Sequence, residues 1–165
     1  MILLFDTDAI IKLNRIGVLQ LVFKAFECII PEAVYKEAVI DAKDRAYWDA
    51  EEIERIVALS GVRIVTTSGR VQEPRMGIGE SAVLSLASES PFDDVVIISD
   101  DKRFLSRLAV EGRLFFDTPT IVAHMARQNV ITYEHAKDLL ARLRPYSSRA
   151  SISVALDALE KEDSP

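Results

Sequence analysis

The sequence predicts an α/β fold, a three-layer α/β/α sandwich with a mainly parallel five-stranded sheet and further helices at the C-terminal end. Two observations lead to this prediction. Short runs of consecutive apolar residues recur along the chain without the polar alternation of half-exposed strands, as expected for strands that are covered on both faces. Between these runs, apolar residues follow the three- and four-residue spacing of amphipathic helices. Alternating strands and helices favour parallel pairing through helical crossovers.

Five segments have the composition of strands, and two of them end in acids. The predicted strands are Ile2–Phe5, Glu27–Ile30, Val62–Val65, Val95–Ser99 and Leu114–Phe116. Asp6 follows the first, and Asp100 and Asp101 follow the fourth. Because ligands of open α/β sheets gather at the carboxyl ends of the strands, these acids are well placed for chemistry.

The segments between the strands predict helices. They comprise two short helices on either side of Gly17, a helix from Pro31 to about Val39, a helix or helical hairpin over 41–59, helices that carry Glu80 and Asp101 in their first turns, Pro119 to about Arg127, Tyr133 to about Leu143, and Ser151–Glu160. The composition of residues 66–76 predicts a loop, and that of residues 91–94 predicts a turn. We expect one domain over 1–130 and a C-terminal helical extension, 131–165, packed on the same domain because it is too short to form its own core.

Composition narrows the class of protein. The 165 residues are 49% hydrophobic and 28% charged, which indicates a globular chain with a substantial core. A net charge of -6 argues against a pervasive positive field for nucleic acid but allows a local basic groove. The single cysteine, Cys28, excludes an intrachain disulfide and lies in an apolar run, where a buried structural role is expected. No apolar run approaches the roughly 20 residues that span a bilayer, so we expect a cytoplasmic protein without membrane partners.

Four acids fall at positions that suggest a common site. Asp6 and Asp101 follow strands, Glu80 begins a helix, and Glu37 lies in a helix that leaves a neighbouring strand. Taken singly, each could be a helix cap, a first-turn acid or a solvated residue. Packed together, they would repel one another and retain protons unless a cation neutralised them, and Mg²⁺ or Mn²⁺ suits oxygen ligands. Such an ion activates water and polarises phosphoryl oxygens, so phosphodiester hydrolysis is the chemistry that we predict.

Other kinds of site fit the sequence less well. His124 and His135 lack the spacing of zinc ligands and fall on predicted helices. The segment Gly77–Gly79 has neither the dinucleotide-binding fingerprint nor the Lys-Ser/Thr of a phosphate-binding loop, and no serine nucleophile elbow occurs. These glycines are expected to shape the turn before the helix that carries Glu80.

The acids lie in four motifs that together resemble the PIN-domain nucleases. Phe5–Asp8 is similar to an apolar strand ending in Asp-Thr/Ser-Ser/Asn, and Ile30–Glu37 to Ile-Pro-x-x-Val-x-x-Glu. Gly77–Val83 is similar to Gly-x-Gly-Glu-x-x-Ala/Val, and Ser99–Phe104 to Thr/Ser-x-Asp-Lys/Arg-x-Phe. The motifs occur in the order of the family and span residues 2 to about 118.

The resemblance implies a PIN-like fold and a divalent-metal-dependent ribonuclease that hydrolyses single-stranded RNA with Mg²⁺ or Mn²⁺. It implies that Asp6, Glu37, Glu80 and Asp101 are both the catalytic acids and the metal ligands. It also makes a homodimer an expected assembly, and it is compatible with the toxin of a toxin–antitoxin pair, whose partner would be an antitoxin protein. The helical tail beyond about residue 130 exceeds the most compact members of the family.

Further acids and bases near these motifs are candidates for the same site. Asp8 stands where the family more often has a small hydroxyl or amide residue, Asp100 at a variable position, and Asp117 where a hydroxyl residue is frequent. The candidate substrate-binding residues, which could follow a phosphate backbone, are Lys12, Arg75, Lys102 and Arg103. A second basic cluster consists of Arg142, Arg144 and Arg149 around Pro145-Tyr146.

Two alternatives remain open from the sequence. A haloacid-dehalogenase-like phosphatase would use Asp6 and Asp8 as nucleophile and acid, but it needs a separate lysine and a Ser/Thr that we cannot place convincingly. A catalytically inactive PIN-fold binding protein would keep the acidic pocket for the arginine of a partner. Glu37→Gln distinguishes the first alternative, because the change should abolish nuclease action and spare a phosphatase.

Overall fold

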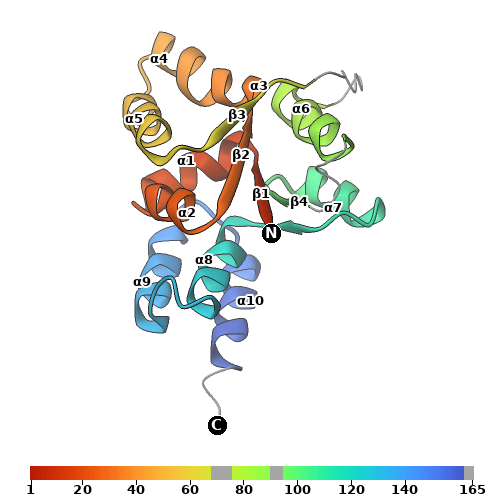
Figure 1. Ribbon diagram of the computed structural model, residues 1–165. Helices are drawn as coiled ribbons and strands as arrows, with labels where there is room; N and C mark the ends of the chain where they lie inside the picture. Colours follow the sequence, from red (N-terminus) through yellow and green to blue (C-terminus); the bar gives the residue numbers. More distant parts are fainter. Residues whose placement is uncertain (68–75, 90–94, 162–165) are drawn as a thin grey trace. The chain divides into compact units, whose positions relative to one another are not determined.

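The computed structural model describes residues 1–67, 76–89 and 95–161 (Figure 1). The predicted loop over 66–76 and turn over 91–94 lie largely outside the described residues, and so does Arg75. The chain forms two compact units, Met1–Phe115 and Phe116–Pro165.

A five-stranded sheet organises the first unit and confirms the predicted fold class. Its strands are β1 (Ile2–Phe5), β2 (Glu27–Pro31), β3 (Arg63–Val65), β4 (Val95–Ile98) and β5 (Phe115–Phe116). Their order across the sheet is β3-β2-β1-β4-β5, with β1 parallel to both β2 and β4, and β2 parallel to β3. The order reverses direction between β1 and β4, and such a switch point is where open parallel sheets bind their ligands.

The two central strands are as buried as their apolar sequences predict. Leu3, Leu4 and Phe5 have no exposed surface, and all four residues of β4 are buried. Phe5 pairs in register with Ile98, so the residues that follow the two strands emerge side by side. The register therefore places Asp6 next to the start of the β4–α7 connection.

Helices cover both faces of the sheet. They are α1 (Thr7–Arg15), α2 (Leu19–Ala25), α3 (Glu32–Tyr35), the π-helical segment η1 (Lys36–Ile40), α4 (Asp41–Asp44), α5 (Ala50–Ser60), α6 (Ile78–Ala87) and α7 (Lys102–Val110). Helices α1, α2 and α5 lie on one side of the sheet, and α6 and α7 on the other (Figure 1). This arrangement is the predicted three-layer sandwich.

The helices between β2 and β3 differ in detail from the prediction. The helix expected to end near Val39 continues through η1 into α4, and the segment expected as a hairpin or helix over 41–59 divides into α4 and α5. The division falls at Ala46, whose φ of 56° lies in the left-handed region and ends the helix. Periodicity alone does not reveal this turn, because the apolar stripe of the segment continues across it.

The second unit is made of the predicted C-terminal helices, α8 (Thr118–Arg127), α9 (Tyr133–Leu143) and α10 (Arg149–Glu160). Each packs on the other two, and their shared core includes Ile121, Val122, Met125, Leu139, Leu140 and Ile152. Thr132 caps α9 by accepting a hydrogen bond from the His135 backbone N–H. The predicted boundary near residue 130, and packing of the extension on the first domain, stay predictions. Across the described residues, no helix combines the length and apolar character needed to cross a membrane.

Candidate active site

Asp6 lies at the centre of the candidate site, between the end of β1 and the start of α1. Its backbone N–H donates to the Ile98 carbonyl at 2.9 Å and extends the pairing with β4 by one residue. One carboxylate oxygen accepts the Thr7 N–H at 2.8 Å, and the other accepts the Ser99 hydroxyl at 2.8 Å. The side chain is therefore held at both oxygens.

Burial makes this carboxylate hard to ionise. Asp6 is only 6% exposed, and burial raises its pKa to about 6. The hydrogen bonds from Ser99 and Thr7 oppose the rise, whereas the negative charges of Asp8 and Glu80 add to it. Asp6 is thus a buried acid among other acids, as the joint placement in the sequence predicts, and it would be stabilised by a cation.

Ser99 connects Asp6 to Asp101, a role that the sequence reasoning missed. The serine follows β4, has no exposed surface, and donates its hydroxyl to Asp6. The Asp101 backbone N–H in turn donates to the Ser99 oxygen at 3.3 Å. The feature of the sequence that indicates this contact is a hydroxyl residue at a strand end, two positions before Asp101.

Asp101 caps α7 and retains one carboxylate oxygen for other contacts. Its Oδ1 accepts the N–H groups of Arg103 and Phe104, both at 2.8 Å. Within the described residues, the second oxygen has no hydrogen bond, and the side chain is partly exposed. Helix capping therefore accounts for only one of the two carboxylate oxygens of Asp101.

Glu37 is brought to the site by the π-helical segment η1. Its Oε2 accepts the Thr7 hydroxyl at 2.8 Å, so Thr7 contacts Asp6 through its N–H and Glu37 through its side chain. Gly79, in the first turn of α6, packs against the same carboxylate: a Cβ added there would lie 2.9 Å from Glu37 Oε2 and 3.4 Å from Thr7 Oγ1. Three helical segments from distant parts of the sequence thus meet at Glu37, and Gly79 permits the close approach.

Glu80 approaches from the same end of α6. Its Oε2 accepts the Gly77 N–H at 3.1 Å and so satisfies one free donor at the start of the helix. Its charge also acts on Asp6 and raises the pKa of that group. The structure therefore brings Asp6, Glu37, Glu80 and Asp101 to one end of the sheet through shared neighbours.

The four acids have the donor atoms of a divalent-cation site, but their side chains are not arranged around a common point. All are oxygen donors, the set that Mg²⁺ and Mn²⁺ prefer. Burial, and to a smaller extent the charges of Asp8 and Glu80, raise the pKa of Asp6. Among residues 1–67, 76–89 and 95–161, however, no three carboxylate, histidine or cysteine side chains are arranged so that they could hold a metal ion. Binding would require the carboxylates now engaged by Thr7, Gly77 or the start of α7 to turn toward a common point.

The three additional acids occupy different environments. Asp8 is exposed and acts on Asp6 through its charge. Asp100 forms an ion pair with Lys12 at 3.2 Å, and only 18% of the Lys12 side chain and 7% of the Asp100 side chain are exposed, so two of our candidates are paired with each other. Asp117 belongs to the second unit, where it caps α8 through the Thr120 N–H and accepts the Ser151 hydroxyl.

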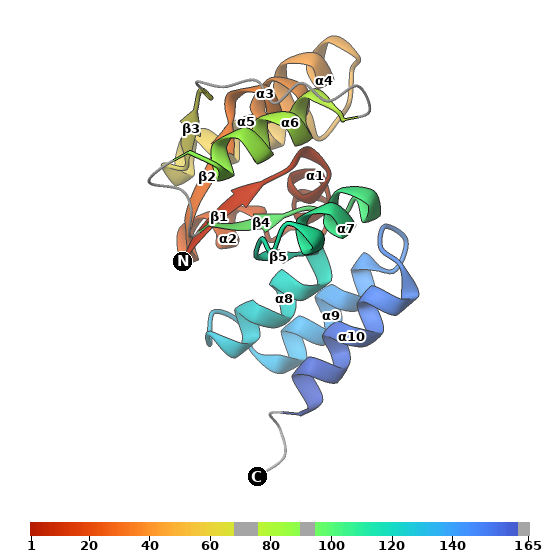
Figure 2. The ribbon, with the colours of Figure 1, turned by 90° about the vertical axis from the view of Figure 1, so that its right-hand side faces the viewer.

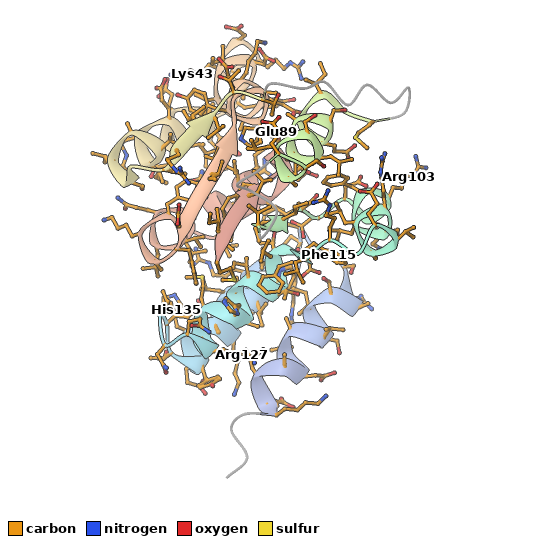
Figure 3. The ribbon with its side chains drawn as sticks, turned by 45° about the vertical axis from the view of Figure 1, so that its right-hand side comes forward. Lys43, Glu89, Arg103, Phe115, Arg127 and His135 are labelled. Atoms are coloured by element: carbon orange, nitrogen blue, oxygen red, sulfur yellow. The ribbon has the colours of Figure 1, made fainter. Side chains whose placement is uncertain are left out.

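The remaining basic candidates begin α7. Lys102 and Arg103 follow Asp101 directly, and both are exposed. Figure 3 shows Arg103 extending away from α7. Positive charge is therefore available next to one of the acids, where a phosphate backbone would be attracted.

Cys28 is buried and both histidines lie on helices, as the sequence predicts. Cys28 is buried on β2, and burial raises the pKa of its thiol to about 12, so the reactive thiolate is not formed at neutral pH. His124 lies on α8 against the Phe116 ring, and burial lowers its pKa. His135 lies in the first turn of α9.

A comparison with protein families identifies the family of the chain. The family model DUF3368, a PIN domain, matches residues 2–164, which is nearly the whole chain. No curated protein matches the sequence.

Proposed function

Because the chain belongs to the PIN-domain family, we propose that it is a divalent-metal-dependent ribonuclease that hydrolyses phosphodiester bonds in single-stranded RNA. The observation that carries the proposal is the placement of Asp6: a buried acid of raised pKa, at the switch point of a parallel sheet, with three other acids approaching it from different elements. Ionisation of a carboxylate in this position destabilises the metal-free fold, a cost that a neutral residue would avoid and that a bound cation would offset.

The proposed roles of the residues follow from their contacts. Asp6, Glu37, Glu80 and Asp101 would hold Mg²⁺ or Mn²⁺, which when bound supplies an activated water and neutralises the charge that develops on the phosphate. Thr7 and Ser99 orient Asp6 by donating one hydrogen bond to each of its oxygens. Glu37 is exposed, so its carboxylate can accept a proton from water or orient it. Lys102 and Arg103 would attract the RNA backbone.

The family match favours this function over a phosphatase that uses Asp6 and Asp8. Homodimerisation, a toxin role with an antitoxin partner, and a cytoplasmic location stay predictions.

The experiment that tests the proposal is cleavage of mixed-sequence, end-labelled single-stranded RNA by the full chain, with Mn²⁺ and with EDTA. We expect cleavage by the wild-type protein with Mn²⁺ only, and a loss of at least about a hundredfold in Asp6→Asn and Glu37→Gln. Asp157→Asn is the matched control, because it makes the same chemical change at an exposed acid of α10.

Three outcomes would contradict the proposal in different ways. Phosphatase activity that survives Glu37→Gln would indicate the alternative enzyme. No cleavage, together with no heat of Mn²⁺ binding in calorimetry, would favour the inactive binding protein. Cleavage that is unaffected by Asp6→Asn would place the chemistry elsewhere in the chain.

A further inference from the structure

The turn between α9 and α10 has a backbone that is fixed by its own hydrogen bonds. The N–H groups of Tyr146 and Ser147 both donate to the Leu143 carbonyl, at 2.8 and 3.0 Å, and Leu143 is fully buried among the three helices of the second unit. Ser148 caps α10 by accepting the Ser151 N–H at 3.2 Å. The turn lies at one end of the α9–α10 pair (Figure 2). Its side chains are therefore displayed from a pre-formed backbone.

This turn carries concentrated positive charge. Arg142, Arg144 and Arg149 are all exposed. The sequence from Asp138 to Asp157 contains no acid between these two residues, although the chain has 26 acids and a net charge of -6. Within the part of the chain that the structure describes, none of the three guanidinium groups has a hydrogen bond or an ion pair.

Three exposed cations of the first unit differ in this respect. Lys43 pairs with Glu54, Arg55 pairs with Glu52, and Arg63 pairs with Glu27. The charge of these side chains is already compensated by a neighbour. Arg142, Arg144 and Arg149 instead leave a local charge of three that an anionic ligand could compensate.

An aromatic residue lies between Arg144 and Arg149 in the sequence of the turn. Tyr146 is 40% exposed and follows Pro145, which restricts the backbone on its N-terminal side. Guanidinium groups match phosphate oxygens in a bidentate geometry, and tyrosine rings stack on bases that are not paired in a duplex. The combination offers a contact for a phosphate backbone and a contact for a base.

From these observations we infer that the α9–α10 turn is a second contact site for single-stranded RNA, formed by Arg142, Arg144, Arg149 and Tyr146. The inference deepens the proposed function, on which it rests for the nature of the ligand. It assigns RNA binding to residues of the C-terminal unit, whereas the candidate catalytic acids all belong to Met1–Phe115. An acidic protein segment would also be attracted to the arginines, but it would gain nothing from a stacking platform.

The test measures RNA binding separately from cleavage. The full chain carrying Asp6→Asn, in EDTA, is titrated against a short fluorescent oligouridine, and fluorescence anisotropy gives the affinity at several salt concentrations. Replacing Arg142, Arg144 and Arg149 together by Gln should make binding less sensitive to salt. The negative slope of log K against log salt should become shallower by about 2, because each phosphate contact with a single strand contributes about 0.7. The matched control replaces Lys43, Arg55 and Arg63 by Gln, which makes the same change in net charge at cations with acidic partners, and should leave the slope nearly unchanged.

Tyr146 tests the stacking contact. Tyr146→Ala should weaken binding about fivefold or more, and Tyr146→Phe should preserve it because the ring remains. Tyr47→Ala removes an exposed tyrosine of the first unit and serves as the control. All these side chains are exposed, and circular dichroism verifies that each variant is folded.

The inference is overturned if the slope of log K against log salt becomes shallower by the same amount in both triple variants, since net charge alone would then explain binding. It is also overturned if Tyr146→Ala has no effect while polyglutamate competes as well as RNA, because the ligand would then be an acidic protein segment. Cleavage by the wild type with unchanged binding by the arginine variant would reject this inference and leave the proposed nuclease intact. A lowered slope without any cleavage would reject the nuclease and retain the binding site.

Discussion

Replacing Asp6 by Asn should stabilise the metal-free protein at neutral pH. Asp6 has a raised pKa of about 6 in the folded protein, against 3.8 for an unperturbed aspartate. Below about pH 4 the group is protonated in both the folded and the unfolded state, so it costs nothing. Between about pH 4 and 6 the unfolded chain releases its proton and the folded protein retains it, so the free energy of unfolding falls as the pH rises. Above about pH 6 the full cost is present.

The size of this cost follows from the pKa difference. About two pKa units correspond to roughly 3 kcal/mol, since each unit is worth about 1.36 kcal/mol. Asn is nearly isosteric with Asp and carries no charge. Its carbonyl oxygen can accept the Thr7 N–H, and its amide can donate to the Ser99 hydroxyl oxygen, so both contacts can be kept. We therefore expect a gain of roughly 2–3 kcal/mol at pH 7.5 and almost none at about pH 4.

Urea denaturation in EDTA, followed by circular dichroism at several pH values, measures this gain. The difference between Asp6→Asn and the wild type isolates Asp6 from the other acids, which titrate in both proteins. Asp157→Asn, at an exposed position, should change stability by less than about 0.5 kcal/mol at every pH. An Asp6→Asn protein that is no more stable than the wild type at pH 7.5, or that gains equally at both pH values, would refute the reasoning.

Three further predictions concern the same site. Mn²⁺ should raise the melting temperature of the wild type and have little effect on Asp6→Asn, because a ligand that binds only the folded state stabilises it; equal shifts in the two proteins would show binding elsewhere. Gly79→Ala should lower RNA cleavage at least about tenfold, because the new Cβ displaces the Glu37 carboxylate, while urea denaturation shows a change of at most about 1 kcal/mol. Ser99→Ala should destabilise the protein by about 1–3 kcal/mol at pH 7.5, because the buried Asp6 loses a hydrogen bond, and an undiminished free energy of unfolding would contradict the role of Ser99.

The sequence predicted the sheet well because its central strands are buried on both faces. Ile2–Phe5 and Val95–Ile98 have a continuous apolar character that leaves little ambiguity, and they form β1 and β4 at the switch point. The positions of Asp6 and Asp101 at strand ends follow directly from that pattern. What the sequence could predict of the site is therefore the part that depends on where strands end.

The other features of the site depend on contacts between segments far apart in the chain. The Ser99–Asp6 hydrogen bond joins residues 93 positions apart, and the approach of Gly79 to Glu37 joins α6 to η1. The π-helical segment that carries Glu37 was also not predicted, because an α-helical period does not distinguish a turn that closes with i→i+5 hydrogen bonds. Tertiary contacts of this kind have no local signal in a single sequence.

Asp6 can be compared with Asp101 and Asp117, which also stand at helix N-caps. Asp101 caps α7 and Asp117 caps α8, each by accepting N–H groups two or three residues along the chain. Asp6 accepts one backbone N–H, that of the adjacent Thr7, and it is buried beside other negative charges. Asn or Ser would cap α1 comparably without the cost of ionisation. Helix capping therefore explains a polar residue at this position but not a charged one, and the proposed divalent cation would supply the opposite charge that a carboxylate there requires.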